Sequence, residues 1–152
     1  MMSGKTRKGR LRDRVTLGTW FGDELPVNIL MIDDNPDMLE ILRLLLKVNG
    51  HRPIMALGGK KGLDIARKEL PDVILLDIMM PDIDGFEVLR QLKLDTLTEE
   101  IPVIFVTAVN GHEFIAKAMS LGAEGYVTKP YTRNELMSLI NEACSTAAVP
   151  AK

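Results

Sequence analysis

The chain has 152 residues, of which 46% are hydrophobic and 26% charged, so it is long enough to bury one core and short for two. Its single cysteine, Cys144, excludes an internal disulfide and argues against a structural zinc site. No apolar run approaches the roughly 20 residues that a membrane helix needs, and we therefore expect a cytoplasmic protein.

Charge is distributed unevenly along the chain. Residues 1–26 carry six basic and three acidic side chains, whereas residues 27–146 carry 12 basic and 18 acidic ones. We predict a flexible basic arm over 1–26, one folded domain over 27–146 and a short tail over 147–152. The arm is either a solvated tail or a segment that docks on an acidic partner or membrane surface. The acidic body disfavours specific nucleic-acid binding and favours bound cations.

Short apolar runs alternate with amphipathic segments of helix length from Val27 onward. Most of the runs are continuously apolar, which is typical of strands covered on both faces of a parallel sheet. The runs predict five strands, at 27–32, 53–57, 73–76, 102–106 and 125–128.

The gaps between the runs carry helix signals. Asn35 can cap a first helix that begins at Pro36 and ends near Gly50. Thr132 to Glu135 form a capping box at the start of the last helix. Between them we predict helices at about 60–70, 86–95 and 112–121, the last of them ending at Gly122. The pattern is (βα)5, which predicts an α/β fold with a doubly wound five-stranded parallel sheet.

Sheets of this kind bind ligands at the carboxyl ends of their strands. Polar residues stand at four of the five predicted ends: Asp33 with Asp34, Asp77, Thr107 and Lys129. The second strand offers no candidate. Each residue alone has a structural alternative as a turn, a helix cap or a surface group, but all of them fall at one edge of the sheet, which favours a functional site.

The chemistry of this group indicates a cation and a phosphoryl group. Carboxylates about 4 Å apart repel by roughly 3–4 kcal/mol per pair at an effective dielectric near 20. A hard cation such as Mg²⁺ offsets this repulsion because it prefers oxygen ligands. Asp77 beside such a cation can attack phosphorus and form an acyl phosphate. The Thr107 hydroxyl and the Lys129 ammonium can contact the phosphoryl oxygens.

These residues, with the run Asp77 to Gly85 and the pairs Thr107-Ala108 and Lys129-Pro130, resemble the receiver domain of two-component response regulators over about residues 27–146. The resemblance implies a flavodoxin-like fold with strand order 2-1-3-4-5. It implies that Asp77 is the phosphoacceptor and that Thr107 and Lys129 bind the phosphoryl group. It also implies a Mg²⁺ ligand set of Asp77, Asp34 directly, Asp33 through water, and the backbone carbonyl of Met79.

The resemblance further implies a switch and a set of partners. Tyr126 falls at the family's aromatic switch position, with core filling as the alternative, and the Lys129-Pro130 bond is expected to be cis. The phosphoryl donor would be a sensor histidine kinase or a histidine phosphotransfer protein. The face formed by the predicted fourth helix, fifth strand and fifth helix, about 112–146, would change its affinity for a downstream protein target and is a candidate dimer contact.

The chain ends soon after the last predicted helix, so we expect a stand-alone receiver, a signalling switch that takes part in its own phosphoryl transfer and dephosphorylation. A receiver fragment of a longer regulator or hybrid kinase would have the same sequence pattern. A metal-dependent hydrolase with an aspartyl nucleophile is disfavoured because Met79 stands where that pattern has a second Asp. A flavin module is disfavoured because Asp33 and Asp34 would repel its phosphate.

Three further expectations concern apolar and titratable residues. Met79 and Val109 are apolar and cannot hold an attacking water, which predicts a long-lived phosphoryl state. We expect His51 and His112 to be ordinary loop or surface residues, and Cys144 an ordinary helix residue.

Overall fold

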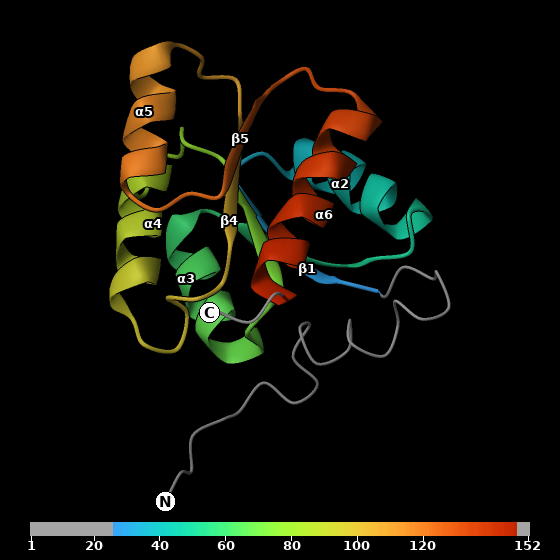
Figure 1. Cartoon of the computed structure of the whole chain (residues 1–152), viewed down its shortest axis with the longest axis horizontal. Coiled ribbons are helices and arrows are strands. Elements are labelled where there is room, and N and C mark those ends of the chain that lie inside the picture. Colours follow the sequence, from blue (N-terminus) through green and yellow to red (C-terminus); the bar gives the residue numbers. More distant parts are fainter. Residues whose placement is uncertain (1–25, 149–152) are drawn as a thin grey trace, which may run out of the picture.

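The computed structural model describes residues 26–148, so residues 1–25 of the predicted arm and 149–152 of the predicted tail lie outside the described part of the chain. Within residues 26–148, strands and helices alternate strictly, as predicted (Figure 1). The elements are β1 (Asn28–Asp33), α2 (Pro36–Val48), β2 (Arg52–Leu57), α3 (Gly59–Glu69), β3 (Val73–Leu76), α4 (Gly85–Leu94), β4 (Val103–Thr107), α5 (His112–Ser120), β5 (Gly125–Thr128) and α6 (Arg133–Ala148).

All described strands pair in parallel, in the order β2-β1-β3-β4-β5, which confirms the predicted fold class and strand order. Helices α2 and α6 cover one face of the sheet and α3, α4 and α5 the other (Figure 1). The chain leaves β1 toward β2 on one side and returns to β3 on the other. The carboxyl ends of β1 and β3 therefore form the point where the winding direction reverses, the usual ligand position in such sheets.

The inner strand β1 shows why its residues are apolar on both faces of the sheet. In β1, Ile29 and Met31 belong to the core beneath α2 and α6, whereas Leu30 and Ile32 belong to the core beneath α3, α4 and α5. All four are at most 1% exposed. Alternate side chains of a strand point to opposite faces, so a strand buried on both sides must be apolar throughout.

The predicted helix starts are confirmed. The Asn35 side chain accepts hydrogen bonds from the backbone N–H groups of Asp37 and Met38, at 2.9 and 3.2 Å. In the capping box, Thr132 N–H donates to the Glu135 carboxylate at 2.8 Å and Glu135 N–H donates to the Thr132 hydroxyl at 3.1 Å. These bonds satisfy amide groups that have no partner inside the helix.

Strand bounds differ from the predicted ones by one residue at several ends, because the parallel ladder extends beyond the apolar run. Asp33 pairs with Leu57 and Thr107 with Thr128, so both polar residues are the last residues of their strands rather than the first residues after them. Ladder pairing gives these two side chains a fixed direction at the sheet edge. The Lys129-Pro130 peptide bond is cis, as expected.

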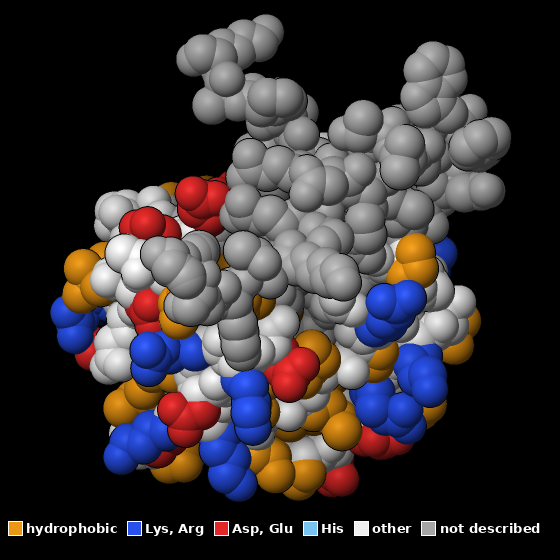
Figure 2. Space-filling model, turned by 90° about the horizontal axis from the view of Figure 1, so that it is seen from below, with side chains coloured by type: hydrophobic (Ala, Val, Ile, Leu, Met, Phe, Trp, Pro, Cys, Tyr) orange, Lys and Arg blue, Asp and Glu red, His pale blue; other side chains and the backbone are white. Residues whose placement is uncertain are grey.

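His51 was predicted to be a loop or surface residue, and it is a loop residue that is buried rather than exposed. His51 lies in the loop before β2 but is 7% exposed, and its Nδ1 accepts a hydrogen bond from Val27 N–H at 3.3 Å. His112 is exposed at the start of α5, and Cys144 is a buried residue of α6. Acidic and basic side chains are interspersed on the face shown in Figure 2. Within the described residues, none of the helices is long and apolar enough to cross a membrane.

Candidate functional site

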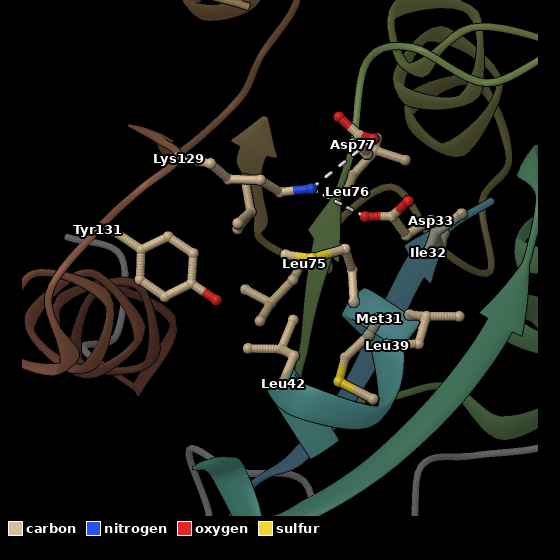
Figure 3. Close-up of a pocket in the computed structure, with 12 residues that line it drawn as sticks. Met31, Ile32, Asp33, Leu39, Leu42, Leu75, Leu76, Asp77, Lys129 and Tyr131 are labelled. Atoms are coloured by element: carbon tan, nitrogen blue, oxygen red, sulfur yellow. Dashed lines mark hydrogen bonds and ion pairs between the residues drawn. The ribbon is translucent and has the colours of Figure 1, made fainter. Parts of the chain in front are cut away.

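The side chains predicted at the strand ends meet at one edge of the sheet. Asp33 ends β1, Asp77 follows β3, and Lys129 follows β5 and reaches across toward both (Figure 3). They line a hollow whose floor is apolar, formed by side chains such as Leu39 and Leu75. The predicted convergence of these groups is therefore confirmed, whereas their chemical roles stay predictions.

Three carboxylates form the acidic part of the site. Asp33, Asp34 and Asp77 each offer an oxygen, and these oxygens all lie within 4.8 Å of one another. Asp33 and Asp77 are each 8% exposed, whereas Asp34 is exposed. Carboxylate oxygens at this spacing, partly open to water, suit a hard divalent cation that keeps some of its water ligands.

Lys129 partly balances this charge. Its Nζ lies 3.0 Å from Asp33 Oδ2 and 3.9 Å from Asp77 Oδ2. The ammonium is thus closer to Asp33 than to the predicted phosphoacceptor. One ammonium opposes three carboxylates, so the group keeps an excess of negative charge that a cation can offset.

Asp77 is held in one orientation and is unusually basic. Its Oδ1 accepts a hydrogen bond from Ile78 N–H at 2.8 Å. Burial raises the pKa of Asp77, while hydrogen bonding with Thr107 and the positive charge of Lys129 act in the opposite direction and do not cancel the rise. A desolvated carboxylate is a stronger base than one in water.

Val109 links Thr107 to Tyr126 through its backbone. Its N–H donates to the Thr107 hydroxyl oxygen at 3.2 Å, which leaves the hydroxyl proton available for Asp77. Its carbonyl accepts a hydrogen bond from the Tyr126 hydroxyl at 2.7 Å. The Tyr126 ring packs on Phe105 with the ring centroids 5.9 Å apart. One residue of the loop between β4 and α5 therefore contacts both predicted switch side chains.

Met79 and Tyr131 also lie close to the acidic cluster. Met79 lies in the loop between β3 and α4, and its side chain is 66% exposed. The metal contact predicted for its backbone carbonyl stays a prediction. Tyr131 was not singled out from the sequence, although the structure places its ring beside Lys129 in the wall of the hollow (Figure 3). Burial raises the pKa of Tyr131, and the charge of Asp33 adds to the rise. Its aromatic character after Lys129-Pro130 is the one sequence signal for this position.

Comparison with known proteins decides the family. A profile of the response regulator receiver domain matches residues 29–141. The chain belongs to this family. Receivers are signalling switches rather than conventional enzymes: they take part in phosphorylation-type signalling, interact with kinases and downstream targets, and typically bind Mg²⁺ at an acidic pocket such as the one described above.

Relatives of this receiver differ in length. It is 40% identical over 113 residues to PilH of Pseudomonas aeruginosa, covering 74% of this chain and 93% of PilH. It is 35% identical over 114 residues to the response regulator MprA of Mycolicibacterium vanbaalenii, covering 75% of this chain and 48% of MprA. The chain thus spans nearly all of one relative and about half of the other.

Solved structures show the same architecture. A putative response regulator from Chloroflexus aurantiacus superposes with a TM-score of 0.75 at 27% identity, covering 80% of this chain and 99% of that one. A receiver domain from Clostridium thermocellum superposes with a TM-score of 0.73 at 31% identity, covering 79% and 95%. The receiver fold therefore covers about four-fifths of the chain.

Proposed function

We propose that Asp77 accepts a phosphoryl group from a phosphohistidine on a sensor kinase or a histidine phosphotransfer protein, in the presence of Mg²⁺. The observation that carries the proposal is the juxtaposition of Asp77 with two further carboxylates within 4.8 Å and with the Lys129 ammonium 3.9 Å away. A buried carboxylate beside both a cation site and a fixed cation is the arrangement that phosphoryl transfer to an aspartate requires.

The side chains divide the work of the reaction. Asp33, Asp34, Asp77 and the Met79 carbonyl would hold the cation, which when bound neutralises charge on the phosphoryl oxygens. A carboxylate oxygen of Asp77 attacks phosphorus, the phosphorus–nitrogen bond of the donor breaks, and its electron pair returns to the imidazole. Lys129 is close enough to stabilise the oxygens of the new acyl phosphate, and its reach to both acidic residues lets it change partner during the reaction.

The same network supports a switching role. A phosphoryl group on Asp77 competes for the hydroxyl proton of Thr107, whose oxygen also accepts from Val109 N–H. Movement of Thr107 therefore acts on the loop residue that binds the Tyr126 hydroxyl. This gives a physical route from the acidic site to the face formed by α5, β5 and α6, which we propose as the surface for a downstream protein target or a second copy of the chain.

The experiment that tests the proposal is intact mass measurement after incubation with a small-molecule acyl phosphate. Wild type should gain one phosphoryl group in the presence of Mg²⁺ and none after Mg²⁺ is removed by chelation. Asp77→Ala should gain none, whereas Asp64→Asn, a change on the exposed face of α3, should behave as wild type. A phosphoryl group on Asp77→Ala, or labelling that ignores Mg²⁺, would refute the assignment.

The wider role of the chain follows from the same proposal. The match covers 93% of PilH, which supports a receiver that acts through contacts with other proteins. We propose the folded receiver over 27–146 as the functional unit. Apolar side chains at Met79 and Val109 support slow loss of the phosphoryl group.

A further inference from the structure

Among the described residues, the end of β2 provides no side chain to the acidic cluster. The segment that follows it nevertheless contacts both Asp33 and the loop after Asp77. Gly58, between β2 and α3, donates its backbone N–H to the backbone carbonyl of Asp33 at 3.0 Å. This bond continues the β1–β2 ladder to the point where the acidic site begins. The start of α3 is therefore fixed relative to Asp33.

On its other side, the start of α3 holds the loop that follows Asp77. The Asp82 carboxylate accepts hydrogen bonds from Lys60 N–H at 2.8 Å and from Gly59 N–H at 3.2 Å. The residue before α3, Gly58, has no side chain to cap these amides, so Asp82 caps the helix from another loop. The hydrogen bond from Lys60 is the largest cause of a lowered pKa at Asp82, so the carboxylate is ionised at neutral pH.

The start of α3 and the loop after β3 also pack closely against each other. A Cβ atom at Gly59 would lie 2.6 Å from Ile83 Cγ1 and 2.8 Å from Val88 Cγ2. These distances are far below normal contact, so a larger residue at the first position of α3 would displace the side chains of Ile83, in the loop after β3, and of Val88, in α4. The absence of a side chain there allows the loop after β3 to lie directly on the helix terminus.

We propose that Asp82 is a positioning residue: by capping the N-terminus of α3 it fixes the loop 78–84 relative to Asp33, and thereby sets the geometry of the divalent-cation site. The loop leaves the sheet at Asp77 and joins α4 at Gly85, whose N–H donates to the Ile78 carbonyl at 2.8 Å. Asp82, three residues after Met79, attaches this loop to the start of α3 through its hydrogen bonds with Gly59 and Lys60. The inference rests on the proposed function, because it assigns the loop a role in holding Mg²⁺.

The test compares Mg²⁺ affinity and amide hydrogen exchange in the full chain and three variants. Asp82→Ala should bind Mg²⁺ about three- to tenfold more weakly, less than the 10- to 100-fold loss typical of groups bonded directly to a ligand. Amides of residues 59, 60, 78–80 and 82–84 should exchange faster in this variant. Asp82→Asn keeps an oxygen that caps helices and should restore most of both properties. Thr132→Ala removes the cap of α6 and serves as a control of similar cost to stability.

The outcomes separate this inference from the function on which it rests. Wild-type affinity and exchange in Asp82→Ala would overturn it, as would an equal loss of affinity in Thr132→Ala, because the effect would then be one of general stability. Failure of Asp82→Asn to restore binding would also overturn it, since charge rather than capping would be responsible. If wild type bound no Mg²⁺, the cation site itself would be refuted, and hydrogen exchange would still decide whether Asp82 orders the loop.

Discussion

Gly85 begins α4 against the backbone of Asp77, where a side chain has no room. A Cβ atom there would lie 2.4 Å from the Asp77 carbonyl oxygen and 2.8 Å from Ile78 Cα. A carbon and an oxygen in ordinary contact are at least about 3.4 Å apart, so Gly85→Ala requires a shift of about 1 Å. The obstructing atoms are backbone and cannot rotate away, so the shift must move the start of α4 or Asp77 itself.

This shift should cost both stability and function. Overpacking of a buried site destabilises by about 1–3 kcal/mol, and we expect a loss near 2 kcal/mol in the free energy of unfolding, measured with urea. A displacement of about 1 Å at a reacting group can slow a reaction about 100-fold, so labelling by an acyl phosphate should slow by a factor between 10 and 100.

Gly125→Ala is the matched control for this prediction. Its nearest obstruction is a flexible side-chain carbon, Leu139 Cδ2, at 3.2 Å. We expect it to stay within about 1 kcal/mol of wild type and to be labelled at the normal rate. Wild-type stability and labelling in Gly85→Ala would refute the argument that backbone contact at this glycine positions Asp77.

Two further predictions concern Asp77 and the loop after β4. Asp77→Asn should raise the free energy of unfolding at pH 7 by about 0.5–2 kcal/mol. Burial raises the pKa of Asp77 above its ordinary value of 3.8, so the folded wild type binds this proton more tightly than the unfolded chain and loses stability as the pH rises through the raised pKa. The two proteins should converge in urea unfolding below about pH 4, and equal stability at pH 7 would contradict the prediction. Val109→Gln should shorten the half-life of the phosphorylated form several-fold, because an amide can orient an attacking water; an unchanged half-life, followed by intact mass, would contradict it.

Local sequence signals were sufficient for the elements and for most of the candidate site. Continuous apolar runs such as Val73 to Leu76 predicted buried parallel strands, because a strand covered on both faces has no position for a polar side chain. Asn35 and the Thr132–Glu135 pair predicted helix starts, because capping depends on neighbours within three residues. The strand ends then located Asp33, Asp77 and Lys129 at one edge, since parallel strands share their direction.

Tertiary structure alone decided which of these groups contact one another. Lys129 is nearer to Asp33 than to Asp77. This preference depends on where β1 and β5 end along the edge of the sheet, and those two strands are separated by β3 and β4. The Asp82 carboxylate caps a helix that begins 22 to 23 residues earlier in the chain, a contact that no spacing in the sequence indicates. His51 was predicted to be an ordinary loop or surface residue; it lies in a loop, but its side chain is buried and its Nδ1 accepts a hydrogen bond from Val27 N–H. Each of these contacts joins segments distant in sequence, and no local spacing or propensity encodes the distance between them.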